Sequence, residues 1–249
     1  MNPIKEFENE VEERLKLNSD NKPFQDISND FLVKSLEEKY SYNFSWMGRP
    51  VIQYPQDVFV MQEIIWDVKP DVIIETGIAH GGSLIFSASM LSLLETCGEI
   101  ENGRVLGIDI DIRDHNKQAI LDHPMSKKIT MLEGSSIDEA IVNQVKEFAS
   151  TGKKVLVCLD SNHTHDHVLA ELNAYAELAD IGSYCVVFDT VIEQLPQGSF
   201  PDRPWDKGDN PYTAVTEFLK TNDKFVIDQD IDNKVMVTVS PQGYLKRVK

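Results

Sequence analysis

Histidine and aspartate side chains are concentrated between Asp160 and His167, where three histidines and two aspartates occur within eight residues. The stretch follows an apolar run at 155–159 that is typical of a buried strand. A further aspartate, Asp189, ends a similar run at 184–188. If these runs are neighbouring parallel strands, the carboxylates of Asp160 and Asp189 converge. Two convergent carboxylates indicate a divalent-metal site, an acid–base pair or two helix caps, and oxygen ligands favour Mg²⁺ over zinc.

The histidines are compatible with more than one chemistry. In the interpretation that we favour, Asp160 binds a hard cation and His163 acts as a general base at neutral pH. His165 and His167 then lie in the first turn of a helix and have structural roles. The alternative is a metallo-hydrolase that holds zinc through His163, His165 and His167, although the β-lactamase-type motif His-x-His-x-Asp-His is one residue longer than this stretch. A nucleotide-binding protein without catalytic activity is the third alternative.

A glycine-containing turn lies between the first apolar run, 72–74, and a helix predicted at 84–94. Its sequence is Glu75-Thr76-Gly77-Ile78-Ala79-His80-Gly81-Gly82-Ser83. Gly77 permits a tight turn, and the later glycine pair lets a ligand approach the backbone at a helix N-terminus. The turn is not a GxGxxG dinucleotide motif, because Ala79 stands where the second glycine would be, and no P-loop Lys-Ser/Thr follows. Alone it indicates a nucleoside site only weakly.

Acidic and hydroxyl side chains follow the next two apolar runs. Asp109 ends the second run, and an acidic residue there can accept hydrogen bonds from both ribose hydroxyls of an adenosine ligand. Asp111 is better explained as a favourable charge at a helix N-terminus. The third run is followed by Glu133-Gly134, which could flank an adenine ring. Ser135 and Ser136 come next, either as ligand contacts or as a helix N-cap.

Strands and helices alternate from residue 71 onward, which indicates an open, doubly wound α/β domain with a mostly parallel sheet. Five such strands and a final pair make a seven-stranded sheet. Residues 224–227 and 235–239, joined by 228–234, predict that the final pair is antiparallel. In sheets of this kind ligands bind at the carboxyl ends of the strands, where the polar residues above are placed.

The residues before this alternation predict a separate segment. Residues 1–45 form an N-terminal helical arm, with helices predicted at 4–16 and 24–39, and residues 46–249 form the α/β domain. The link at 46–55 is irregular because it contains two prolines and a glycine. The arm has apolar faces but no sheet of its own to cover, so we expect it to pack against a neighbouring subunit in a homo-oligomer.

Composition narrows the possible partners. The formal net charge is −17, so binding to nucleic acid or to an anionic membrane surface is not expected. No apolar stretch approaches the roughly 20 residues of a membrane helix. The residues after Met1 lack a basic region followed by an apolar run, and the three cysteines are typical of reduced thiols. We therefore expect a cytoplasmic protein without a secretory signal.

Taken together in this order and spacing, the motifs resemble the cephalosporin hydroxylase family, which is grouped with rhamnosyl and macrolide-sugar O-methyltransferases. The resemblance runs from about residue 45 to the end of the sequence. It includes the turn at 75–83, the Asp109-Ile110-Asp111 strand end and the Asp160…His163 pair. The flanking segments that carry it are Trp46-Met47-Gly48, Tyr54-Pro55-Gln56-Asp57, Asn210-Pro211-Tyr212-Thr213-Ala214-Val215-Thr216-Glu217-Phe218-Leu219 and Pro241-Gln242-Gly243-Tyr244-Leu245.

The resemblance implies the Rossmann-like class I methyltransferase fold and an S-adenosylmethionine-dependent, Mg²⁺-dependent O-methyltransferase. It implies that the turn holds the methionine part of the cofactor and that Asp109 binds the ribose. The cofactor-binding residues expected are Glu75, Thr76, Gly77, Ala79, His80, Gly81, Ser83, Asp109, Asp111, Ser135, Ser136 and Asp160. It also implies Asp160 and Asp189 as metal ligands and His163 as the general base.

One position departs from the relatives. Several of them carry an acidic residue immediately before the second aspartate, where this sequence has Phe188. The metal shell is then completed by Thr190, water or substrate. Vicinal hydroxyls chelate a metal, so the expected acceptor is a sugar or a glycosylated small molecule. The loop at 193–210 is long and contains Trp205, and we expect it to cover that acceptor.

Overall fold

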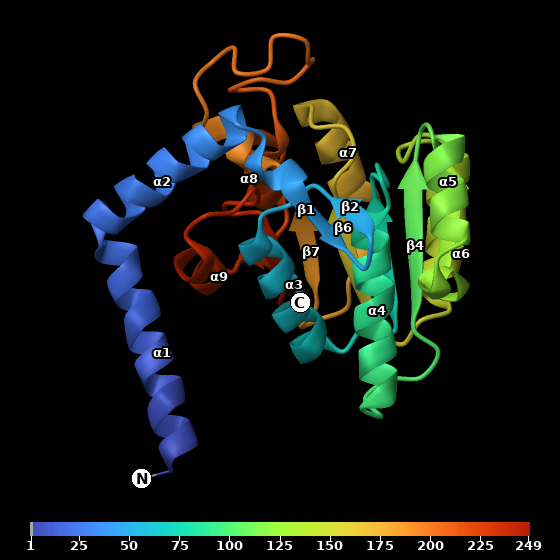
Figure 1. Cartoon of the computed structure of the whole chain (residues 1–249), viewed down its shortest axis with the longest axis horizontal. Coiled ribbons are helices and arrows are strands. Elements are labelled where there is room, and N and C mark those ends of the chain that lie inside the picture. Colours follow the sequence, from blue (N-terminus) through green and yellow to red (C-terminus); the bar gives the residue numbers. More distant parts are fainter. Residues whose placement is uncertain (1) are drawn as a thin grey trace.

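A computed structural model describes residues 2–249 of the chain, and these residues build a seven-stranded sheet between two layers of helices (Figure 1). The strand order is β5-β4-β3-β6-β7-β9-β8. The first five strands in that order are parallel, whereas β9 is antiparallel to both β7 and β8. The expected doubly wound, mostly parallel sheet with an antiparallel final pair is therefore confirmed.

The elements have the following bounds. The strands are β1 Phe44–Trp46, β2 Arg49–Val51, β3 Val72–Thr76, β4 Arg104–Asp109, β5 Ile129–Glu133, β6 Val155–Leu159, β7 Tyr184–Val187, β8 Phe225–Ile227 and β9 Tyr244–Arg247. The α-helices are α1 Pro3–Asp20, α2 Lys22–Glu37, α3 Pro55–Val68, α4 Gly82–Thr96, α5 Asp114–Leu121, α6 Glu139–Ser150, α7 His165–Tyr175, α8 Pro211–Thr221 and α9 Gln229–Val235. Short 3₁₀ helices cover Tyr40–Asn43, Pro124–Lys128, Ala176–Leu178 and Thr190–Gln194.

Each face of the sheet has its own hydrophobic core, because successive side chains of a strand point to opposite faces. Ile73 of β3 and Leu156 of β6 are opposite each other in register and pack with α3 and α4 on one face. Ile74 and Val157 belong to the other face, with α6, α7 and α8. All four side chains are fully buried. Helices on both faces leave the carboxyl ends of the parallel strands as the open edge of the sheet.

The C-terminal strand pair differs from the sequence prediction. Residues 235–239 do not form a strand, and 229–235 form α9 instead of a connecting turn. The strand that pairs with β8 is β9, which lies between β7 and β8. Val239 is buried, but its N–H donates to a carboxylate oxygen of Asp57 and its carbonyl accepts from Val191. The apolar alternation of 235–239 therefore reflects burial without strand pairing.

The segment expected to be an irregular link contains a two-stranded hairpin, β1–β2. Its two turn residues, Met47 and Gly48, both have positive φ, which is typical of the tight turns that suit antiparallel strands. The hairpin packs against the start of α4. A Cβ atom on Gly82 would lie 2.1 Å from the carbonyl oxygen of Pro50, so this contact requires glycine.

The N-terminal arm consists of α1 and α2, and its two helices differ in burial. No residue of α1 is buried, and this helix extends away from the sheet (Figure 1). The end of α2 belongs to the body of the domain, because Leu32 is buried and the hydroxyls of Ser35 and Tyr54 lie 2.5 Å apart. The proposed boundary at residue 45 falls inside β1. No helix in the described part of the chain is long and apolar enough to span a membrane.

Candidate functional site

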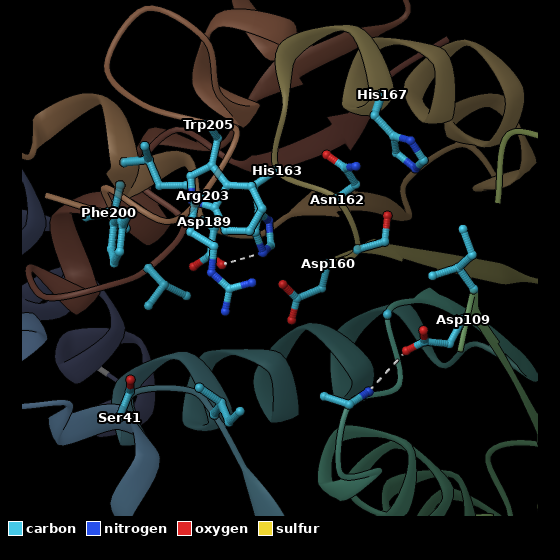
Figure 2. A pocket seen from close by; sticks show the side chains of 18 of the residues that line it. Ser41, Asp109, Asp160, Asn162, His163, His167, Asp189, Phe200, Arg203 and Trp205 are labelled. Atoms are coloured by element: carbon cyan, nitrogen blue, oxygen red, sulfur yellow. Dashed lines mark hydrogen bonds and ion pairs between the residues drawn. The ribbon is translucent and has the colours of Figure 1, made fainter. Parts of the chain in front are cut away.

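The turn after β3 is held by the ends of the two neighbouring strands. Asp109, at the end of β4, accepts hydrogen bonds from the backbone N–H groups of Ile78 (2.8 Å) and Ala79 (3.3 Å). Gly77 has φ of +88°, and Ala79 also has positive φ. On the other side the N–H of Asp160 donates to the carbonyl of Thr76 at 2.9 Å. The carboxylate predicted to bind a ribose thus also fixes the turn beside it (Figure 2).

Several of the residues predicted to bind a cofactor make contacts within the protein that support the turn. Glu75 is buried and accepts a hydrogen bond from the Ser83 hydroxyl of α4. Burial raises the pKa of Glu75 to about 7, although the Ser83 hydrogen bond lowers it in part. The His80 carbonyl accepts from the Arg49 guanidinium, and Gly81 stands at the N-cap of α4. These residues shape the turn from beneath.

Asp160 and Asp189 converge as predicted, because β6 and β7 are parallel neighbours and each aspartate follows its strand. Together with His163 they form a group whose potential ligand atoms all lie within 4.8 Å of one another. The Nε2 atom of His163 is 3.2 Å from Oδ2 of Asp189 (Figure 2). Asp189 has φ of 57°, a left-handed conformation that aspartate tolerates better than most residues. Such strain is often found at functional sites.

Negative charge accumulates around Asp160. Burial raises the pKa of this carboxyl group well above its usual range, and the nearby carboxylates of Asp189, Glu75 and Glu171 raise it further. Among the described residues, no lysine or arginine lies within ion-pair distance of Asp160 or Asp189, and the imidazole of His163 is the one basic side chain at that distance. Two carboxylates and one imidazole with this charge balance fit a divalent cation that prefers oxygen ligands.

Two residues beside Asp189 point elsewhere. The buried hydroxyl of Thr190 donates to the carbonyl of Pro241 at 2.7 Å, so it faces that carbonyl instead of the carboxylate group. Phe188 is buried in the hydrophobic core that contains α3 and α4. Because Thr190 and Phe188 point away from the two carboxylates, water or substrate would complete the coordination of a cation bound there.

The three histidines have separate partners. His165 Nδ1 lies 2.8 Å from the Thr213 hydroxyl, and its Nε2 lies 3.3 Å from Glu217 of α8. His167 contacts Ser136, on the other side of α7. Of the residues that the structure describes, only Asp160, His163 and Asp189 form a group that could hold a metal. The geometry therefore gives no support to a zinc site made by His163, His165 and His167.

A cavity of about 790 Å³ connects these groups along the open edge of the sheet. Among the residues singled out from the sequence, those that line it include Gly77, Ala79, Asp109, Gly134, Ser135, Ser136, Asp160, His163, His167, Asp189 and Trp205. Figure 2 shows Asp109, Asp160, His163, His167, Asp189 and Trp205 around it. Asp111 is exposed beyond the cavity and forms a 3.8 Å ion pair with Arg113. The size is within the range of small-molecule sites.

The loop at 193–210, which was predicted to cover the acceptor, lines the cavity. The ring of Trp205 stands edge-on to His163 with 4.7 Å between ring centroids, and the Arg203 guanidinium lies 5.2 Å from the Trp205 ring. Phe200 lines the same wall. Asn210 holds the base of the loop, because its side chain caps α8 and also donates to Glu193 at 2.7 Å.

Sequence reasoning missed a second wall of the cavity. Lys39, Ser41 and Tyr42, from the end of the arm, line it together with Leu36. The arm was not expected to have a role in binding, and no motif marks these residues. A signal did exist for Glu171, which is a charged residue within the apolar stripe of α7 and is fully buried.

Residues 38–248 match the protein family described as Rhamnosyl O-methyltransferase/CmcI. The chain belongs to this family. Its members include S-adenosylmethionine-dependent O-methyltransferases, so the enzyme class implied by the sequence motifs is confirmed. The rhamnosyl O-methyltransferases of Mycobacterium bovis and Mycobacterium tuberculosis are each 28% identical over 229 residues, covering 88% of this chain and 86% of theirs. The Mycobacterium leprae protein is 28% identical over 173 residues, covering 67% and 71%.

Solved structures of CmcI have the same fold. An apo structure of CmcI superposes with a TM-score of 0.58 at 17% identity, covering 84% of this chain and 77% of that one. A CmcI structure described as containing Mg and S-adenosylmethionine gives a TM-score of 0.57 at 17% identity, covering 84% and 78%. At this identity the similarity establishes the methyltransferase fold of the chain, with its seven-stranded sheet.

Proposed function

We propose that this protein transfers the methyl group of S-adenosylmethionine to a hydroxyl group of a sugar or glycosylated small molecule, with Mg²⁺ bound at Asp160 and Asp189. The observation that carries the proposal is the position of the Asp160–His163–Asp189 group in the same cavity as the turn after β3. Methyl transfer needs an activated methyl group and an acceptor oxygen aligned within one site.

Four cavity residues support the cofactor assignment. Gly77 and Ala79 line the cavity, and so do Asp109 and Ser135, at the ends of β4 and β5. A carboxylate at the end of the second parallel strand is suited to binding ribose hydroxyls. Asp109 uses its oxygens to fix the turn but retains acceptor capacity, because a carboxylate offers about four lone-pair positions.

In the proposed reaction, a bond forms between the acceptor oxygen and the methyl carbon while the carbon–sulfur bond breaks. The sulfonium becomes the thioether of S-adenosylhomocysteine, and the hydroxyl proton passes to the ring nitrogen of His163 that does not face Asp189. Asp189, 3.2 Å from Nε2 of His163, accepts a hydrogen bond from that nitrogen, orients the ring and stabilises its protonated form. A bound magnesium ion supplies Lewis acidity that lowers the pKa of the acceptor hydroxyl.

The lining of the cavity supports a glycoside acceptor. Trp205, Phe200 and Tyr42 offer aromatic surface, and Lys39 and Ser41 offer polar groups. Sugar rings expose both C–H faces and hydroxyl groups, so a wall of this mixed composition suits them. The name of the mycobacterial relatives, rhamnosyl O-methyltransferase, points to the same class of acceptor. We therefore assign the space between Trp205 and the end of the arm to the acceptor.

The experiment compares His163→Ala with His165→Ala, which changes a histidine of the same segment that does not line the cavity. Methyl transfer from labelled cofactor to a panel of rhamnosyl and other deoxyhexosyl glycosides is measured with Mg²⁺, beside S-adenosylhomocysteine affinity by calorimetry. We expect His163→Ala to keep its affinity and to lose about 10²–10⁴-fold in turnover, as for loss of a general base. Unchanged turnover in this variant would refute the base assignment, and no S-adenosylhomocysteine binding by the unmodified protein would refute the methyltransferase function.

A further inference from the structure

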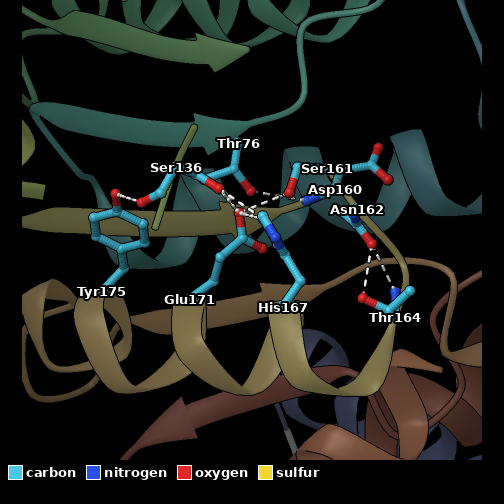
Figure 3. Close-up of polar contacts among 9 residues, drawn as sticks. All are labelled: Thr76, Ser136, Asp160, Ser161, Asn162, Thr164, His167, Glu171 and Tyr175. Carbon is cyan, nitrogen blue, oxygen red and sulfur yellow. Dashed lines mark hydrogen bonds and ion pairs between the residues drawn. The ribbon is translucent and has the colours of Figure 1, made fainter. Parts of the chain in front are cut away.

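A buried carboxylate lies beneath the cavity and takes no part in the proposed reaction. Glu171 of α7 is fully buried, and its Oε1 accepts hydrogen bonds from the hydroxyls of Ser136 (2.5 Å) and Ser161 (2.7 Å) (Figure 3). Its Oε2 is also buried and has no hydrogen-bond partner among residues 2–249. A buried carboxylate is costly unless hydrogen bonds stabilise it. The two serines and the nearby His167 are the groups that contact Glu171, so its carboxylate holds them in position.

The same hydrogen bonds fix the proton of His167. Its Nε2 lies 2.9 Å from the Ser136 hydroxyl oxygen and 3.5 Å from Oε1 of Glu171. A serine hydroxyl has one proton, which here goes to the carboxylate, so the Ser136 oxygen accepts from Nε2–H of His167. In the neutral ring the other nitrogen, Nδ1, then carries a lone pair and accepts hydrogen bonds.

These three residues do not form a catalytic triad. In a Ser-His-acid triad the carboxylate contacts the ring nitrogen that is opposite to the serine. Here Glu171 and Ser136 meet the same nitrogen of His167, and Glu171 also accepts a hydrogen bond directly from the serine hydroxyl. The arrangement orients the imidazole and leaves the serine without a base.

His167 lies at the end of the cavity beyond Asp109. Ser135, Ser136 and His167 line that end, and so does Ile110, a large apolar side chain that is 74% exposed. Because β5 lies outside β4 in the sheet, the residues after β5 stand farther out than Asp109, the proposed ribose ligand. A flat ring attached to that ribose would lie beside Ile110 with one edge toward His167.

We propose that His167 selects adenine over other purine bases, with its unprotonated Nδ1 accepting a hydrogen bond from the exocyclic amino group. This inference rests on the proposed function, because it requires the S-adenosylmethionine site at Asp109. Hypoxanthine and guanine have a carbonyl oxygen at that position, which would face the Nδ1 lone pair with no proton between them. Ser136 and Glu171 act as positioning residues that hold the required tautomer.

The test measures calorimetric affinities for S-adenosylhomocysteine and S-inosylhomocysteine, which differ in the amino and carbonyl group. We expect the unmodified protein to prefer the adenine compound by at least about tenfold, as expected when a hydrogen bond is replaced by two facing acceptors. In His167→Phe the preference should fall to about twofold or less. His165→Phe, the matched change on the same helix, should retain it, and circular dichroism confirms that both variants are folded.

A second readout does not depend on ligand. Long-range ¹H–¹⁵N correlation spectra of the free protein report which nitrogen of His167 carries the proton. We expect Nε2–H, and a spectrum showing Nδ1–H would overturn the inference. Equal affinity for the two nucleosides would overturn this inference alone, whereas binding of neither would overturn the proposed function and the adenine selection with it.

Discussion

The backbone of Gly77 lies directly against the carbonyl oxygen of Asp160. A Cβ atom built on Gly77 would be 1.9 Å from that oxygen, far inside van der Waals contact. The two residues follow neighbouring parallel strands, β3 and β6, so their contact joins the turn to the proposed metal site. Gly77 also has φ of +88°, and both features exclude a side chain.

Replacing Gly77 with alanine should therefore displace the turn. We expect a lower Tm and loss of measurable S-adenosylhomocysteine binding, because the added methyl group forces β3 and β6 apart at the site. Gly98→Ala is the matched control, since Gly98 also has positive φ but no atom lies within 4 Å of the place that its new methyl group would take. Both variants bear the backbone strain of about 1 kcal/mol, and only the Gly77 variant has the clash. Equal Tm values for the two would contradict the importance of the contact.

Glu75 should make stability depend on pH. Its pKa is raised from 4.5 to about 7 by burial, so the folded state holds this proton more tightly than the unfolded state. The stabilisation from the bound proton is complete below pH 4.5 and is lost as pH rises through 7. Glu75→Gln keeps an acceptor for Ser83 and should gain stability relative to the unmodified protein between pH 5 and pH 8. The gain is on the order of 3 kcal/mol at most.

Urea unfolding at the two pH values measures this difference directly. Glu101→Gln is the control, because Glu101 is exposed and its substitution should give the same stability difference at both pH values. A Glu75→Gln effect that does not grow with pH would show that the carboxyl group titrates near its ordinary value.

Magnesium should stabilise the folded protein through Asp189. At a concentration about 100 times Kd, binding adds about 2.7 kcal/mol. For a domain of this size that corresponds to a rise in Tm of roughly 5–10 °C, reversed by chelator. Asp189→Asn should abolish most of the rise, and Asp111→Asn, which alters an exposed aspartate outside the cavity, should preserve it. If added Mg²⁺ does not change the Tm of the unmodified protein, this result would count against a metal at this site.

The arm should mediate self-association. Ile4 and Phe7 of α1 are 67% and 62% exposed, which is unfavourable for large apolar side chains in a monomer. We expect light scattering to give a mass above that of one 28.2 kDa chain. Changing both residues to serine should shift the mass toward the monomer, whereas serine at Glu8 and Glu12 of the same helix should not. A monomeric unmodified protein at micromolar concentration would exclude this role.

The carboxylate group was predictable because its two strands are marked by apolar runs and each aspartate comes directly after one. Parallel neighbours then bring Asp160 and Asp189 together by geometry alone. The same reasoning placed Asp109 at the edge of the cavity. The wall made by Lys39 and Tyr42 could not be predicted, since it depends on where the arm turns back onto the domain.

The other differences between the sequence prediction and the structure occur where the burial of a residue does not follow from the local sequence pattern. Residues 235–239 alternate like a strand, but Asp57 takes the N–H of Val239 that a strand would pair. The hairpin turn at Met47 was missed because a non-glycine residue with positive φ leaves no reliable sequence mark. Glu171 could have been noticed as a charged residue within the apolar stripe of α7, but its partners are serines from two other loops, which no linear spacing reveals.

The position of β9 has a consequence for synthesis and handling of the protein. β8 pairs only with β9, and β9 is made after every other strand of the sheet. While the nascent chain emerges, β7 and β8 therefore have open edges with unpaired backbone groups, which invite aggregation. Residues 244–247 close both edges at once. Folding yield should consequently be sensitive to the loss of residues 244–247.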